Sequence, residues 1–210
     1  MTTVVVGITG ASGSGKTRLA ASLFQYIAQQ HGEASVGVIC EDYYYKDQQD
    51  IPFQDRRHTN YDHPNSMDHD LLMTHLAALR AGQSVSLPQY DYTQHTRSSD
   101  TIEMAPKTII IVEGILLFAD EKLRTSFDYL IYVDTPLDIC FIRRAERDMR
   151  ERGRAFEGIA QQYERTVRPM YFAFIELSKC WADIIVPSWK ENDVAVEFIQ
   201  SRICAHLLKK

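Results

Sequence analysis

The sequence predicts an α/β fold in which a parallel sheet is covered by helices on both faces. Short apolar, β-branched runs recur along the chain, and segments with helical periodicity lie between them. A glycine-rich turn joins the first apolar run to the first helical segment. Because parallel strands need long crossover connections, which are usually helices, this alternation favours a parallel sheet.

The expected elements follow from this alternation. Strands are expected in the short apolar runs, at residues 4–8, 36–40, 109–112, 130–133 and 182–186. Helices are expected where apolar side chains recur every three or four positions, at residues 16–30, 69–81, 136–152 and 194–208. Asp68 is expected to cap the second helix, and Gly32 and Gly82 to end the first two. Pro136 suits the first turn of the third helix because its ring presets φ.

Two further segments, residues 43–67 and 83–104, show little periodicity and are rich in Tyr, His, Asp and Pro. We expect them to leave the sheet as a small excursion that builds a binding pocket. No linker, repeat or low-complexity stretch interrupts the chain. Residues 1–210 are therefore expected to form a single domain.

The composition excludes several classes of protein. The chain of 210 residues is 45% hydrophobic and 24% charged, which is enough apolar material for a core and argues against disorder. The formal net charge of −5 is not the basic footprint that nucleic acid binding needs. No apolar run approaches the ~18–20 residues that span a bilayer, and the first residues lack the basic region of a signal peptide. The four cysteines lie far apart, without a C-x-x-C pair. We expect a reduced, cytoplasmic protein with neither membrane nor nucleic acid as partner.

Residues 10–17 match the pattern G-x-x-x-x-G-K-[ST] at every fixed position, between an apolar strand and an amphipathic helix. Such a P-loop turns its backbone N–H groups toward one anion at the positive end of a helix dipole. Lys16 then reaches the β- and γ-phosphates, and the Thr17 hydroxyl can ligate Mg²⁺. We therefore expect a P-loop NTPase-type sheet whose phosphate-binding residues are Gly10, Ala11, Ser12, Gly13, Ser14, Gly15, Lys16 and Thr17.

Glu113 is a second candidate for the metal. It follows the apolar run 109–112, at the position where P-loop proteins usually have a strand that ends in Asp. The longer glutamate could hold Mg²⁺ directly or through a water molecule. The alternative is a helix-capping or surface glutamate.

Six arginines crowd into residues 143–154. Some have acidic partners at i,i+4 spacing, namely Arg144–Asp148 and Arg147–Glu151. Others form like-charge pairs at that spacing, Arg143–Arg147 and Arg150–Arg154, each of which costs a few tenths of a kcal/mol on an isolated helix. A shared phosphate would offset this cost, because planar guanidinium groups suit its oxygens. We expect an Arg-rich lid over about residues 143–165 that closes over ATP; a solvated helix face is the alternative.

The excursions indicate what receives the phosphate. Asp42 directly follows the second strand, at the end of the sheet where α/β folds bind ligands. Tyrosines, carboxylates and a histidine in both excursions are typical of a pocket for a sugar and a flat base. A carboxylate can accept both hydrogens of a vicinal diol, and tyrosines offer stacking faces. Taken singly, each has another explanation as core packing, a loop residue or a turn former.

Together, in this order, these motifs resemble the uridine kinases, also called uridine–cytidine kinases, from Val4 to about Pro187. The resemblance rests on the P-loop and on six further motifs: Glu-Asp-x-Tyr-Tyr-Lys-Asp at 41–47, Asn-Tyr-Asp-His-Pro at 60–64, Glu-Gly-Ile-Leu at 113–116, Val-Asp-Thr-Pro-Leu-Asp at 133–138, Arg-Asp-x-x-Glu-Arg-Gly-Arg at 147–154 and Thr-Val-Arg-Pro-Met at 166–170. It implies transfer of the γ-phosphoryl group of ATP or GTP to the 5′-hydroxyl of uridine or cytidine, which gives UMP or CMP in pyrimidine salvage. It also implies Mg²⁺, a homotetramer, and CTP or UTP as feedback inhibitors.

The resemblance further implies a role for each matching residue. Asp42 would face the 5′-hydroxyl and act in catalysis together with Lys16 and Arg147. The nucleoside would be held by Asp62, on the ribose diol, and by Tyr45, Tyr90, Tyr92, His95 and Gln162. Phosphates would be held by Arg144, Arg152 and Arg154, and the metal by Thr17 and Glu113.

Two positions depart from the family pattern. Residues 187–192 read Pro-Ser-Trp-Lys-Glu-Asn, where relatives often have a basic, glycine-containing stretch near the adenine. Tyr92 stands where relatives often have Phe.

Two other functions stay open. A phosphoribulokinase-like kinase of a sugar alcohol would leave Tyr90, Tyr92 and His95 idle. A regulator that binds ATP or CTP without turnover would need no acceptor site.

Overall fold

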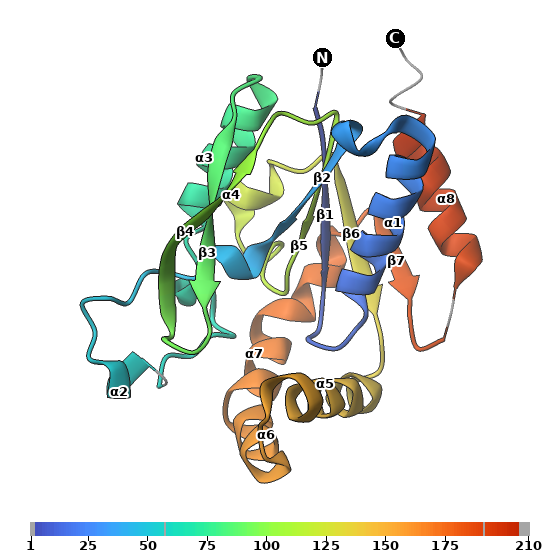
Figure 1. The fold of residues 1–210 in the computed structure, drawn as a ribbon. Helices are drawn as coiled ribbons and strands as arrows, with labels where there is room; N and C mark the ends of the chain where they lie inside the picture. The colour runs from blue at the N-terminus through green and yellow to red at the C-terminus, as the bar shows by residue number, and fades with distance from the viewer. Residues whose placement is uncertain (1–2, 57, 191, 206–210) are drawn as a thin grey trace.

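A computed structural model describes residues 3–56, 58–190 and 192–205. Its centre is a five-stranded sheet in which every strand is parallel to its neighbours, in the order β2-β5-β1-β6-β7 (Figure 1). These strands are β1 (Val4–Gly10), β2 (Val36–Cys40), β5 (Ile109–Glu113), β6 (Tyr129–Asp134) and β7 (Ile184–Pro187). The predicted fold class, a P-loop NTPase-type α/β sheet, is confirmed.

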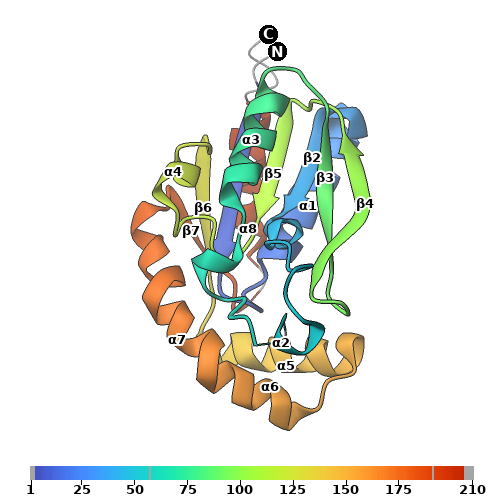
Figure 2. The ribbon, with the colours of Figure 1, turned by 90° about the vertical axis from the view of Figure 1, so that its left-hand side faces the viewer.

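The sheet is covered on both faces because its central strands are apolar on both sides. On one face, Val6 and Ile8 of β1 pack in a core cluster with Leu23 of α1 (Lys16–His31) and with α8 (Asp193–Cys204). On the other face, Val5 packs with Leu72 of α3 (His69–Arg80). Figures 1 and 2 show α1 and α8 on one side of the sheet and α3 on the other.

The second excursion is more regular than its sequence suggests. It forms an antiparallel hairpin of β3 (Val85–Asp91) and β4 (Thr96–Met104), with an irregularity in register between Pro88 and Tyr90. Most of β4 is exposed and polar, so no apolar alternation marks it as a strand. The first excursion carries the short helix α2 (Phe53–Arg56).

A helical arm crosses the carboxyl ends of the strands. Figure 1 shows α5 (Leu137–Arg152) and α6 (Phe156–Gln162) below the sheet. A further helical run leads from α6 back toward β7. In this run, residues 163–167 and 171–175 form π-helix, and α7 (Arg168–Met170) lies between them. The sequence pattern predicts neither a helix nor a strand between residues 156 and 181. Pro136, which is expected in the first turn of α5, directly precedes this helix.

The remaining boundaries differ little from expectation. Asp68 caps α3, and its carboxylate accepts a hydrogen bond from the Leu71 N–H at 3.1 Å. The last strand begins at Ile184, and the closing helix ends at Cys204; the part of its expected span at 206–208 lies outside the described residues. A short helix, α4 (Glu121–Arg124), lies between β5 and β6.

None of the helices in the described ranges combines the length and the apolar character that crossing a membrane requires. Within those ranges the four cysteines are free thiols, of which Cys180 is exposed.

Candidate active site

The strand register brings the candidate residues to one edge of the sheet. Ile8 of β1 pairs with Glu113 of β5, and Glu113 pairs with Cys40 of β2. Two residues beyond these pairs lie Gly10, where the P-loop begins, and Asp42. The loop, Glu113 and Asp42 therefore end their strands side by side.

The P-loop is held by its backbone. Gly13 has φ of 86°, and a Cβ at this position would overlap the Cys140 carbonyl of α5, so only glycine fits here. The Thr135 hydroxyl donates to the Ser14 carbonyl oxygen at 2.9 Å and ties the loop to the β6–α5 connection. The first N–H groups of α1 face the loop, where they are available to an anion. In the described ranges, the buried Ser14 Oγ has no hydrogen-bond partner.

Thr17 and Glu113 lie together beside this loop. The Thr17 hydroxyl donates to Oε1 of Glu113 at 3.2 Å. Burial raises the pKa of Glu113, and the nearby charge of Lys16 lowers it by a smaller amount. A hard cation would supply the missing charge, and these oxygens are ligands that Mg²⁺ accepts. No cluster of three or more His, Cys, Asp or Glu suited to a metal occurs among the described residues.

Asp42 lies half-buried in the short 3₁₀ turn, Glu41–Tyr44, that directly follows β2. The hydroxyl of Tyr92 donates to Oδ2 of Asp42 at 3.2 Å. The Tyr92 ring is 48% exposed, and the guanidinium of Arg152 lies 5.4 Å from its centre. Tyr92 thus connects the hairpin to Asp42 on one side and to the lid on the other.

Asp62 and Arg144 form a buried pair of opposite charges. The Asp62 Oδ1 and Arg144 Nη1 atoms are 4.0 Å apart. Burial raises the pKa of Asp62 and lowers that of Arg144, so desolvation outweighs their mutual attraction. In the described ranges, Arg144 Nε is buried without a hydrogen-bond partner. Arg144 Nη2 donates to Oε1 of Gln162 at 3.4 Å, so the pair is linked to α6.

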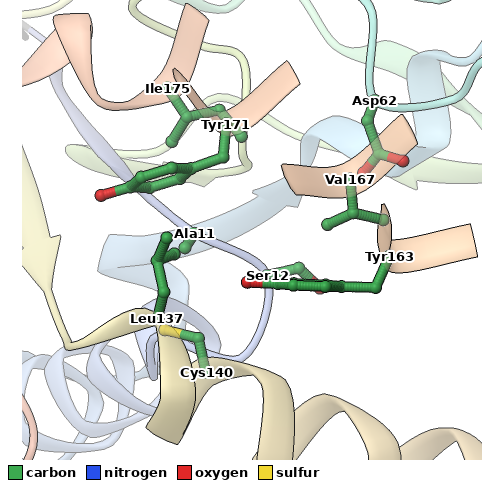
Figure 3. A pocket seen from close by; sticks show the side chains of 9 residues that line it. All are labelled: Ala11, Ser12, Asp62, Leu137, Cys140, Tyr163, Val167, Tyr171 and Ile175. Atoms are coloured by element: carbon green, nitrogen blue, oxygen red, sulfur yellow. The ribbon is translucent and has the colours of Figure 1, made fainter. Parts of the chain in front are cut away.

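Figure 3 shows where Asp62 lies relative to the P-loop. Asp62 lines a narrow cavity together with Ser12 from the loop and Tyr163 and Val167 from the helical arm. Leu137 and Cys140 of α5 line the cavity as well. The ligand-binding carboxylate predicted from the sequence is therefore adjacent to the phosphate loop.

The tyrosines of the excursions pack on one another. The rings of Tyr45 and Tyr90 have centres 5.1 Å apart, and both side chains are buried. The Tyr90 hydroxyl donates to Tyr61 Oη at 3.1 Å, and the Tyr61 ring stacks on His95 with centres 5.9 Å apart. Of the predicted base-binding residues, Tyr92 and His95 are more accessible, whereas Tyr45 and Tyr90 form the wall behind them.

The lid arginines converge on one acid. Asp148 is fully buried in α5, and salt bridges join its carboxylate to four guanidinium groups. The Oδ1 atom lies 2.8 Å from Arg147 and 3.4 Å from Arg152. The Oδ2 atom lies 3.3 Å from Arg154 and 3.8 Å from Arg144. Gln162 of α6 accepts a hydrogen bond from Arg154 at 2.7 Å. Arg147 therefore turns to Asp148, whereas Glu151, its expected partner, pairs with Arg150.

A larger cavity of about 450 Å³ opens on the other side of the P-loop. It is bounded by Gly15 and Arg18 at the start of α1, by Arg143, and by residues 186–190, which form the end of β7 and the segment after it. Arg143 donates to the carbonyl oxygens of Ser188 and Trp189 at 3.2 and 3.4 Å and holds this segment in place. The segment that departs from the family pattern thus lines a cavity that adjoins the P-loop, and Glu191 lies outside the described residues.

Comparison with known proteins identifies the family. Residues 5–195 match the model of the phosphoribulokinase/uridine kinase family. The chain belongs to this family. The uridine kinase of Proteus mirabilis (strain HI4320) is 53% identical over 95% of this chain and 93% of its own length, and that of Yersinia pestis (strain Pestoides F) is 50% identical over 95% and 94%. The solved D-glycerate 3-kinase of Cryptococcus neoformans aligns with 82% of this chain and 79% of its own, with 18% identity and a TM-score of 0.62, which supports the fold alone.

Three acidic or basic residues of this phosphoribulokinase/uridine kinase family member are not predicted as part of the site from the sequence. Asp148 was considered only as an i,i+4 partner of Arg144, although it is the centre of the lid cluster. No role is predicted for His69 or for Glu41, although Glu41 belongs to the motif at 41–47, and the two form a buried contact of 2.9 Å. Glu41 precedes Asp42 in the chain, and a charged residue at the end of a buried strand was the available signal.

Proposed function

We propose that this member of the phosphoribulokinase/uridine kinase family transfers the γ-phosphoryl group of ATP or GTP to the 5′-hydroxyl of uridine or cytidine and forms UMP or CMP. The observation that carries the proposal is the placement of Asp42 and the P-loop at one edge of the sheet, with Asp62 beside the loop. Relatives at 53% and 50% identity named uridine kinase support it. Tyr92, which contacts Asp42, and the aromatic cluster of Tyr90, Tyr61 and His95 that adjoins it favour an acceptor with a flat base over a phosphoribulokinase-like sugar substrate.

The donor side supplies positioning and charge. In our proposal the loop N–H groups and Lys16 hold the β- and γ-phosphates, and the donor base enters the cavity of about 450 Å³ past Gly15. Thr17 and Glu113 would hold Mg²⁺, which neutralises charge on the phosphate oxygens when it is bound. Because the transition state is loose, fixed dipoles and charges do most of the catalytic work.

Asp42 acts on the acceptor side. The 5′-oxygen attacks the γ-phosphorus in line, the bond from that phosphorus to the β–γ bridging oxygen breaks, and the hydroxyl proton passes to the Asp42 carboxylate. The Tyr92 hydroxyl, 3.2 Å from Asp42 Oδ2, fixes the orientation of that carboxylate. Asp62 would accept hydrogen bonds from the ribose diol, with Arg144 and Gln162 beside it.

The lid neutralises charge on the phosphates. Arg144, Arg147, Arg152 and Arg154 are gathered by one buried carboxylate, so four cations are held within reach of one another before a phosphate arrives. We assign Arg147 to the transferred phosphoryl group and the others to the donor phosphates and the nucleoside edge.

The test is an assay of ADP release with ATP and Mg²⁺ against uridine, cytidine, adenosine, thymidine and ribulose 5-phosphate. Turnover of uridine and cytidine alone is expected; turnover of ribulose 5-phosphate, or of no acceptor, would contradict the proposal. In the Asp42→Asn variant, which keeps the shape and loses the basicity, kcat should fall by ~10²–10⁴. Near-normal turnover would remove Asp42 from this role.

The Asp62 assignment predicts discrimination against 2′-deoxyuridine. Without the 2′-hydroxyl, part of a buried carboxylate loses its partner, at a cost of about 1–3 kcal/mol. The ratio of kcat/KM for uridine to that for 2′-deoxyuridine should therefore exceed about 5-fold in the wild type and approach 1 in Asp62→Ala. Equal values in the wild type would contradict the assignment.

Further expectations rest on the family resemblance. We propose a homotetramer in the cytoplasm that serves pyrimidine salvage and is inhibited by CTP or UTP. Sedimentation analysis checks the first property, and inhibition assays at fixed ATP check the last.

A further inference from the structure

A buried contact between Glu41 and His69 lies next to Asp42 in the chain. Glu41, the residue before it, is fully buried, and His69 at the first position of α3 is 6% exposed. Nothing in the proposed chemistry uses either side chain. Glu41 precedes Asp42 in the same turn, and His69 begins the helix that follows the loop with Asp62.

Both oxygens of Glu41 are occupied. His69 Nε2 donates to Oε1 at 2.9 Å, and the Leu116 N–H donates to Oε2 at 2.9 Å. A Cβ on Gly114 would overlap the Glu41 carboxylate, so the carboxylate fills the space that this glycine leaves. On the other side of the imidazole, Nδ1 lies 3.5 Å from Oδ2 of Asp120, the cap of α4.

Glu41 thereby joins three segments of the site. Its own segment carries Asp42, and the segment it contacts through Leu116 follows Glu113. Through His69 it reaches α3, which follows the loop that carries Asp62. A shift of this carboxylate would move the ends of β2 and β5 relative to each other.

Stability alone does not account for this arrangement. A buried ion pair contributes little net stability, because desolvation of the two charges cancels most of their attraction, and an apolar pair of similar volume serves as well. Burial lowers the pKa of His69, but the hydrogen bond and charge of Glu41, together with Asp120, outweigh it and raise the pKa above the ordinary value of 6.5. A hydrogen-bonded pair fixes the relative orientation of its two side chains, whereas an apolar pair does not.

We propose that Glu41 and His69 are positioning residues that fix Asp42 relative to Glu113 and the P-loop for phosphoryl transfer. This inference rests on the proposed function. Because a misplacement of about 1 Å can cost about 100-fold in rate, loss of the pair should lower kcat and leave substrate binding intact.

The test uses the double variant Glu41→Leu/His69→Leu, which replaces the pair by apolar side chains. We expect Tm to fall by roughly 2–12 °C, because the buried Leu116 N–H loses its acceptor. KM for ATP and uridine should stay within 3-fold, and kcat should fall 10- to 100-fold. A wild-type kcat in this variant would overturn the proposal. His75→Leu is the matched control, because His75 lies on the same helix and is hydrogen-bonded to the Tyr44 hydroxyl at 2.9 Å and not to Glu41; its kcat should stay within 2-fold of the wild type.

A second pair of variants decides the question if the double variant does not fold. His69→Gln retains a donor close to the place of Nε2, whereas His69→Leu does not. Positioning requires His69→Gln to keep at least a third of the wild-type kcat and His69→Leu to lose 10-fold or more; equal kcat values overturn it. Turnover of uridine by the wild type is measured first. If the wild type does not turn over uridine, the proposed function and this inference are both overturned. If it does, the variants test the positioning role alone.

Discussion

The P-loop and the lid are both proposed to face phosphate, but they are built in opposite ways. In the loop, residues 10–17 present backbone N–H groups whose directions follow from local φ and ψ angles. In the lid, four arginine side chains are gathered by one buried acid, Asp148. The loop depends on glycines that are close in sequence, whereas the lid depends on a charge balance that only the folded arm creates.

This difference determines how each region should fail. A change in the loop backbone removes the anion site itself, because no other conformation aims the N–H groups at one point. A change at Asp148 leaves every arginine in place but removes what holds them together. The predictions below separate these two kinds of failure, from the largest effect to the smallest.

Gly13→Ala should have the largest effect. A Cβ at this position would overlap the Cys140 carbonyl, and φ of 86° is strained for alanine. We expect kcat/KM for ATP to fall at least 100-fold and the free energy of unfolding to fall by about 2–3 kcal/mol. Steady-state kinetics and urea unfolding measure the two quantities.

Gly158→Ala is the matched control for Gly13→Ala. Gly158 lies in α6, where an added Cβ meets no atom within 4 Å and the backbone is helical. This variant should be more stable by about 0.5–1 kcal/mol and keep its activity. If Gly13→Ala behaved like this control, the loop would not be held by its backbone as described.

Asp148→Asn should act on the lid. The substitution leaves four guanidinium groups without their shared counter-charge. Only Arg144 is buried, and the other three are at least one third exposed to water, so we expect a loss of stability of about 1–3 kcal/mol. We expect KM for ATP to rise about 10-fold, because the arginines then separate. Glu151→Gln, which removes only the exposed partner of Arg150, should change stability by less than about 0.5 kcal/mol. A wild-type KM for ATP in Asp148→Asn would show that the cluster does not preorganise the lid.

The same contrast explains what could be predicted from the sequence. The P-loop was predictable because its conformation depends on eight consecutive residues. The edge at which Asp42 and Glu113 lie was predictable because apolar runs set the strands, and parallel strands end together. These inferences needed only local pattern and the general geometry of α/β sheets.

The side-chain clusters could not be predicted in this way. Arg154 reaches Asp148 because Gly153, at φ of 61°, ends α5 and turns the chain back, so that the Arg154 N–H donates to the Asp148 carbonyl at 3.1 Å. The contact of His69 with Glu41 joins residues 28 positions apart. Such contacts depend on tertiary distances that periodicity does not contain. For the same reason the β3–β4 hairpin, whose second strand is polar and exposed, was expected only as an irregular excursion.

The smallest predicted effect tests this contrast within one helix. The pKa of His69 is raised, because Glu41 and Asp120 outweigh burial, whereas burial, assisted by Arg97, lowers that of His75. A raised pKa gives stability that is complete below the unfolded value of 6.5 and is lost as the pH rises through the folded value. A lowered pKa gives stability that is present above 6.5 and is lost as the pH falls through the folded value.

Across pH 5.5–8.5, the loss of unfolding free energy caused by His69→Gln should therefore become smaller as the pH rises. The loss caused by His75→Gln should become larger. Each should change by at most about 1.4 kcal/mol per pH unit. Unfolding free energies of the wild type and both variants measure these slopes. Parallel slopes in the two variants would mean that Glu41 and Asp120 do not govern the charge of His69.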